Sequence, residues 1–100
     1  MSTELLETIK AVAELLQLCG WEDRAAWFNT RLDRLRQLHD AGNAQSLETL
    51  NEIKSVLSGQ GSLTDLPLSP APASGLSRDE ARKRQWELAK RLDFLLSGPR

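Results

Sequence analysis

Hydrophobic residues recur at spacings of three and four along most of the chain, the pattern of helices with one buried face. It predicts four helices, over residues 3–19, 21–41, 46–58 and 77–97. The segment 59–76 lacks this pattern and holds prolines 67, 70 and 72. Because no stretch alternates apolar and polar positions with a period of two, we predict an all-α fold, a four-helix bundle with a Pro-rich loop between helices three and four.

Small and polar residues mark the ends of these segments. Gly20 suits the left-handed residue that ends a helix, and Gly59 has the same role after the third helix. Ser77 and Glu80 form the pattern of a capping box at the start of the last helix. Within the loop, the alternating positions of Leu63, Leu66 and Leu68 predict that the segment lies on the core after a short capped turn.

The apolar stripes of the four helices form the predicted core. They consist of Leu5, Leu6, Ile9, Val12, Ala13 and Leu16; Trp21, Ala25, Phe28, Leu32, Leu35 and His39; Leu47, Leu50, Ile53 and Leu57; and Ala81, Leu88, Leu92, Leu95 and Leu96. Cys19 lies at the edge of the first stripe, where we expect a small buried side chain. His39 extends the second stripe into its last turn, where packing or capping explains it.

Composition is that of one globular domain over residues 1–100, with 40% hydrophobic and 27% charged residues. A single cysteine excludes an internal disulfide and suits a reducing compartment. No apolar run approaches the ~20 residues of a membrane span. Two acidic residues precede the first lysine, unlike the basic start of a signal peptide. We therefore expect a cytoplasmic protein that does not bind membranes.

Residues typical of catalysis or metal binding do not occur at useful spacings. The one histidine and the one cysteine lie in different segments, so they suggest neither a nucleophile–base pair nor a metal site. The stretch GQGS (residues 59–62) resembles a phosphate-binding loop, but it lacks the lysine and preceding strand of such loops, and Asp65 would repel a phosphate. We expect a non-enzymatic protein without a cofactor or metal.

Two exposed aromatic residues are predicted on the last helix. Trp86 and Phe94 fall outside its apolar stripe, with Lys90 between them. An aromatic and charged outer face is typical of an interface core. Three explanations remain open: the Pro-rich segment covers these rings, a partner protein binds them, or a second copy of the chain forms a homodimer through them.

Acidic and basic stretches alternate along the chain. Residues 1–23 and 40–65 are acidic, and residues 24–39 and 66–100 are basic, while the net charge is only −1. The arginines of the second and fourth helices would be the contacts of a nucleic-acid-binding regulator. A sequence pI near 5.8 makes this the less favoured alternative.

The pair Trp27–Phe28 on a long second helix, followed by a third helix and by GQGSLTDL (residues 59–66), carries a family resemblance. It resembles a family of small bacterial helical proteins with a Trp-apolar pair and a G-x-G-S-hydrophobic-x-D-L motif. The resemblance covers residues 4–68. This family is similar in style to the immunity proteins of bacterial toxin systems, which neutralise a cognate toxin by binding it. The resemblance therefore implies an immunity protein or antitoxin.

Such a protein would use acidic side chains to bind a basic site of the toxin, because opposite charges attract across an interface. The expected partner-binding residues are acidic Glu22, Asp23, Asp40, Glu48, Glu52 and Asp65, together with Trp86, Lys90 and Phe94. The alternatives are a homo-oligomeric scaffold or small regulator that uses the Trp86 and Phe94 face, and the nucleic-acid-binding regulator.

Overall fold

A computed structural model describes residues 3–37, 44–57, 63–71 and 74–97. Its elements are α1 (Thr3–Leu18), α2 (Glu22–Gln37), α3 (Ala44–Ser55), the short 3-10 helix η1 (Leu63–Asp65) and α4 (Arg78–Ser97). These ranges contain helices and no strand, so the all-α prediction is confirmed for the described part of the chain.

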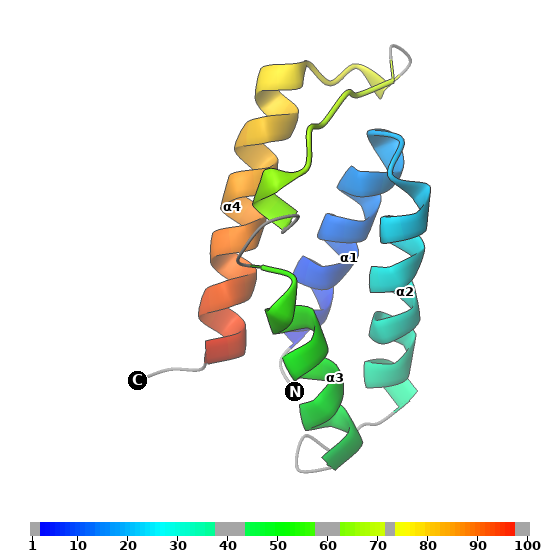
Figure 1. The fold of residues 1–100 in the computed structure, drawn as a ribbon, viewed down its shortest axis with the longest axis vertical. Helices are drawn as coiled ribbons and strands as arrows, with labels where there is room; N and C mark the ends of the chain where they lie inside the picture. Colours follow the sequence, from blue (N-terminus) through cyan, green and yellow to red (C-terminus); the bar gives the residue numbers. More distant parts are fainter. Residues whose placement is uncertain (1–2, 38–43, 58–62, 72–73, 98–100) are drawn as a thin grey trace.

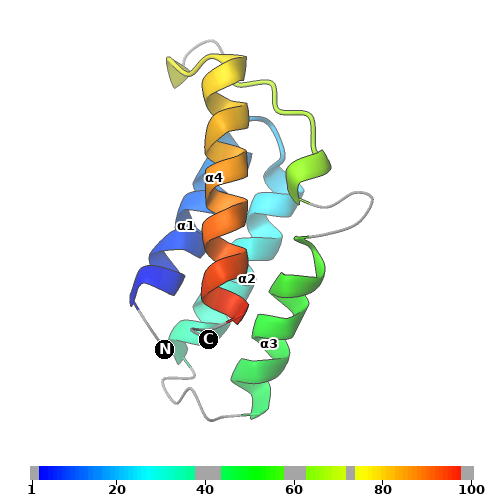
Figure 2. The ribbon, with the colours of Figure 1, turned by 90° about the vertical axis from the view of Figure 1, so that its left-hand side faces the viewer.

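The long helices alternate in direction along the vertical axis of Figure 1. α1 packs against α2 on one side and against α4 on the other. α3 packs mainly on α2 and more briefly on α4, and η1 lies against α4 above the end of α3 (Figure 2). α4 is therefore flanked by α1 from the start of the chain and by α3 and η1 from its middle, and one side of it faces away from all of them.

Most predicted stripe residues in the described ranges are buried in one core or packed against it. The largest fully buried hydrophobic side chains are Ile9, Val12, Leu16, Leu35, Ile53 and Leu92. Cys19 is also buried, as expected. The prediction that Leu47 belongs to the core is wrong. Leu47 is 53% exposed, and Thr49 is the buried residue on this part of α3. His39 and Gly59 lie outside the described residues.

The α1–α2 turn follows the predicted pattern. Gly20 has φ +84°, the left-handed conformation that glycine adopts without a Cβ clash. The backbone N–H of Trp21 donates to the Leu16 carbonyl at 2.8 Å, and that of Gly20 donates to Gln17 at 3.4 Å. This is the Schellman pair of hydrogen bonds that ends a helix. α2 begins at Glu22, directly after Trp21 and one residue later than predicted.

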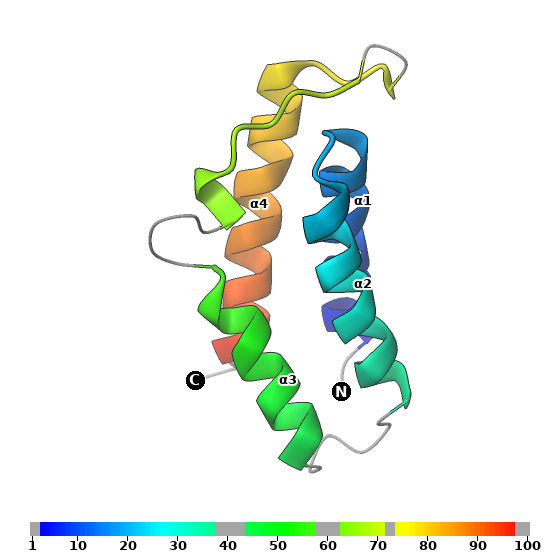
Figure 3. The same cartoon turned by 45° about the vertical axis from the view of Figure 1, so that its right-hand side comes forward.

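Residues 63–71, called the strap below, run from η1 across the end of the molecule where α1 joins α2 (Figure 3). Leu63, Leu66 and Leu68 are buried in the core, as predicted. Polar contacts hold both ends of the strap. The Leu63 N–H donates to the Val56 carbonyl at 2.8 Å, and the Ala71 N–H donates to the Leu18 carbonyl at 3.1 Å.

The middle of the strap is held by two side chains from different helices. The buried Gln85 amide of α4 donates to the carbonyls of Leu63 and Leu66. The Trp21 indole Nε1 donates to the Pro67 carbonyl at 2.9 Å. Backbone carbonyls that the prolines and tight turns leave without helical partners are thus satisfied by side chains.

The start of α4 has the Ser77 half of the predicted capping box. The Ser77 Oγ accepts a hydrogen bond from the Glu80 N–H at 3.1 Å, and the Ser77 carbonyl accepts the first helical bond from Ala81 at 2.9 Å. The cap fixes where α4 begins, and it thereby sets which of its residues face the strap and which face outward.

Candidate protein-binding surface

One row of side chains crosses the outer side of α4 at intervals of four residues. It consists of Arg78, Arg82, Trp86, Lys90 and Phe94, and is called the α4 ridge below. Residues four apart are neighbours on a helix surface. All five are exposed, Trp86 by 53% and Phe94 by 68%. The ridge therefore presents two large rings to solvent, with cations beside and between them.

The strap does not cover these rings. It is hydrogen-bonded to Gln85, on the buried side of α4. Trp86 and Phe94 are exposed in the presence of residues 63–71 and 74–76, the described part of the segment. The alternative in which the Pro-rich segment folds over the rings is therefore wrong for the described part of that segment.

A hollow of about 480 Å³ opens between the strap and the first turns of α4. Residues 64–69 form one wall, and Arg78, Arg82 and Gln85 line the other. The two arginines are thus the end of the α4 ridge and also part of the hollow. Of the residues that line the hollow, the sequence predicts Asp65 as a contact with a protein partner but neither of the two arginines.

The predicted acidic contacts are spread over several elements. Glu22 and Asp23 are exposed in the first turn of α2, and Glu48 is exposed on α3. Asp65 ends η1 and lines the hollow. Figure 1 places the start of α2 and the helix α3 toward opposite ends of the molecule. Asp40 lies outside the described residues.

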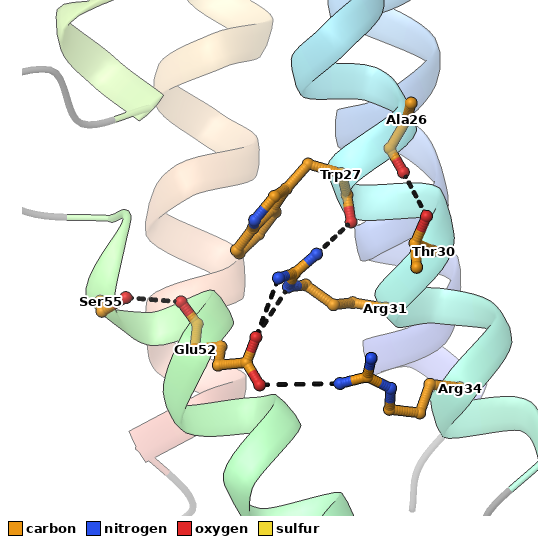
Figure 4. Close-up of polar contacts among 7 residues, drawn as sticks. All are labelled: Ala26, Trp27, Thr30, Arg31, Arg34, Glu52 and Ser55. Carbon is orange, nitrogen blue, oxygen red and sulfur yellow. Dashed lines mark hydrogen bonds and ion pairs between the residues drawn. The ribbon is translucent and has the colours of Figure 1, made fainter.

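Glu52, the remaining predicted acidic contact, is bound within the chain (Figure 4). Its Oε2 lies 2.9 Å from Arg31 Nη2 and 3.1 Å from Arg31 Nε, and its Oε1 lies 3.7 Å from Arg34 Nη1. The Arg31 guanidinium also lies 3.7 Å from the centre of the Trp27 ring. These contacts join α3 to α2, so Glu52 and both arginines have a structural role.

A double-mutant cycle on Arg31 and Glu52 should give a coupling free energy of about 1 kcal/mol. The pair is partly buried, and a planar guanidinium held on a ring loses little freedom when it pairs. Urea unfolding of Arg31→Gln, Glu52→Gln and the double variant measures the coupling. The exposed pair Lys10–Glu14 is the control, with an expected coupling of about 0–0.5 kcal/mol. Equal couplings for the two pairs would contradict this expectation.

Burial also determines the chemistry of Cys19. Desolvation raises the pKa of its thiol, because the thiolate is disfavoured away from water. The reactive thiolate is therefore scarce near neutral pH. Cys19 is a structural residue in this arrangement.

The raised pKa of Cys19 predicts a loss of stability at high pH. Above about pH 8.5 the unfolded thiol ionises while the buried thiol stays protonated, so the free energy of unfolding should fall as the pH rises. Urea unfolding between neutral and alkaline pH measures this slope, which should be shallower in Cys19→Ala. A native thiol that reacts with a thiol reagent as fast as the unfolded chain would contradict the burial.

Other kinds of site find no support in the described residues. Within those ranges, no three His, Cys, Asp or Glu side chains gather in a way that could hold a metal ion. None of the described helices combines the length and apolar character needed to cross a membrane. Comparisons with protein-family models, curated proteins and solved structures found no match. Function is therefore inferred from the residues and their arrangement.

Proposed function

We propose that the protein is a small helical-bundle immunity protein that binds a cognate bacterial toxin and neutralises it. The observation that carries the binding function is the exposure of Trp86 and Phe94 on α4, beside a strap that leaves them open. Tryptophan and other aromatic side chains are enriched at the centres of protein interfaces, where their burial supplies much of the affinity.

The toxin is proposed as the partner because of the resemblance on Trp27–Phe28 and GQGSLTDL. The described residues of these motifs serve the fold. Phe28, Leu63 and Leu66 are buried, and the Trp27 and Phe28 rings meet edge to face at 5.0 Å. The resemblance therefore supports a shared scaffold, and the contacts with the toxin are proposed on the α4 ridge. Exposed Glu22, Asp23 and Glu48 are proposed as further contacts for basic groups of the toxin.

The spacing of the α4 ridge favours a different protein over a second copy. Lys90 lies midway between Trp86 and Phe94. A symmetric antiparallel pair that places Trp86 on the Phe94 of the other copy also places the two Lys90 side chains against each other, and like charges at an interface are unfavourable. A partner with apolar and acidic groups meets both the rings and the cation.

The test is binding and protection with the product of the gene next to this one. We expect that product to be toxic, to bind this protein and to be neutralised by it. Trp86→Ala and Phe94→Ala should each weaken binding roughly tenfold to thirtyfold in calorimetry. Leu18→Ala is the matched control, because Leu18 is 42% exposed but lies on α1, which carries none of the proposed contacts, and it should bind normally.

Three results would overturn the proposal. The first is a neighbouring product that neither binds nor harms the cell. The second is binding that survives both aromatic substitutions. The third is a dimer in light scattering that Trp86→Ala converts to a monomer, which would assign the ridge to self-association.

A further inference from the structure

Ion pairs engage only some of the described arginines. Arg31, Arg34, Arg36 and Arg91 form ion pairs with carboxylates of the chain. Arg78 and Arg82 form none with the residues that the structure describes, although both line the hollow beside the strap. Their charge is therefore available to a ligand that enters the hollow.

Helix stability does not explain Arg78. It occupies the first turn of α4, where the helix dipole is positive and a cation is unfavourable. The acidic residues Asp79 and Glu80 in the same turn suit the dipole, and Ser77 supplies the cap. Because the charge of Arg78 destabilises the helix end on which it lies, a contact outside the helix explains this charge better.

Gln85 fixes the strap beside the two arginines. Its amide nitrogen donates to the carbonyls of Leu63 and Leu66, so the strap is held against α4 where the hollow lies. The hollow thus offers guanidinium donors for an anion, and a carboxylate carried on a peptide is complementary to them.

We propose that the α4 ridge binds an acidic segment of the partner protein, with one carboxylate between Arg78 and Arg82 in the hollow and apolar side chains on Trp86 and Phe94. This inference rests on the proposed function and adds the chemistry of the partner. The order of the ridge fits such a segment, because the cations at 78 and 82 precede the ring at 86 and the cation at 90 lies between the two rings.

Local charge favours a peptide over a nucleic acid. Asp65 lines the same hollow, and Asp79, Glu87 and Asp93 are exposed on α4. A polyphosphate backbone needs a broad basic surface, and the chain as a whole is slightly acidic, with a net charge of −1. A peptide brings single carboxylates in place of a continuous row of phosphates, so it meets less repulsion from these acidic groups.

The probe is a blocked peptide of alternating glutamate and leucine, titrated into the ¹⁵N-labelled protein at low salt. We expect the side-chain amide signals of Gln85 and the indole signal of Trp86 to shift. Replacing every glutamate of the peptide by glutamine should weaken binding at least tenfold, since charge-assisted hydrogen bonds are lost. Added salt should weaken the binding of the glutamate peptide.

The double variant Arg78→Gln/Arg82→Gln should lower the affinity for the glutamate peptide at least tenfold. Both side chains are exposed, so the fold should persist. Arg84→Gln is the matched control. Arg84 lies on the same helix without an ion pair among the described residues, but it faces a separate hollow beside α1 and should be dispensable.

Equal binding by the double variant and Arg84→Gln would overturn the inference, as would the absence of shifts at millimolar peptide. Tighter binding of a single-stranded oligonucleotide than of the peptide would assign the ridge to nucleic acid instead. If the toxin complex is lost in Trp86→Ala but kept in Arg78→Gln/Arg82→Gln, the protein-binding function stands and only the acidic segment is wrong. If both variants keep the complex, the proposed function fails.

Discussion

Leu16→Ala should lower the free energy of unfolding by about 2–5 kcal/mol. Leu16 is fully buried on α1, the helix that packs against both α2 and α4. Removing its isobutyl group loses the transfer free energy of the side chain and leaves a cavity that two neighbouring helices cannot both close. For a chain whose whole stability is expected at roughly 5–15 kcal/mol, this is a large fraction.

Leu18→Ala, two residues further along α1, is the matched control. Leu18 is 42% exposed, so the same chemical change should cost less than about 1 kcal/mol. Urea unfolding followed by circular dichroism gives both values, and the midpoints should separate clearly. Equal midpoints for the two variants would contradict the packing of α1 between α2 and α4.

Gln85→Ala should cost about 2–4 kcal/mol, because two carbonyls of the strap lose their donor. The Leu63 and Leu66 carbonyls lie beside buried leucines, where water replaces the lost amide poorly. Gln85→Met keeps most of the side-chain volume without the donor. It should therefore lose nearly as much stability as the alanine variant, and a stable Gln85→Met would assign the role of Gln85 to packing.

Detachment of the strap from α4 can be followed separately from global unfolding by NMR. The Trp21 indole donates to the Pro67 carbonyl, so its N–H resonance reports directly on the middle of the strap. We expect this resonance to shift and to exchange faster with solvent in Gln85→Ala. Gln17→Ala removes an exposed amide from α1 and should leave the resonance unchanged.

Local rules in the sequence were sufficient for the end of α1 and the start of α4, but not for α3, which was predicted over 46–58 and spans Ala44–Ser55. The period of apolar residues identified Ile9, Val12 and Leu16 as core positions, and Gly20 ended α1 by a conformation that other residues adopt at a cost. Ser77 capped α4 for a reason confined to its own first turn. Each of these features depends on residues within a few positions of one another.

Features that depend on distant segments were missed. Leu47 and Thr49 lie on different sides of α3, and only the placement of α3 against α2 and α4 decides that Thr49 is buried. Gln85 reads as a surface residue until the strap carbonyls, some twenty positions earlier in the chain, meet it. The hollow beside Arg78 and Arg82 requires the path of the same strap, which helical periodicity does not describe.

The position of α1 between α2 and α4 also sets an order of events during synthesis. α1 and α2 are joined by a tight turn, so they can pair early. The other side of α1 stays in water until α4 has been made, because its cover comes from the far end of the chain. At roughly 5–20 residues per second, the ribosome needs about 3–12 s to pass from Gln37 to Ser97. During these seconds the nascent chain exposes an apolar helix face, the kind of surface through which partly folded chains aggregate.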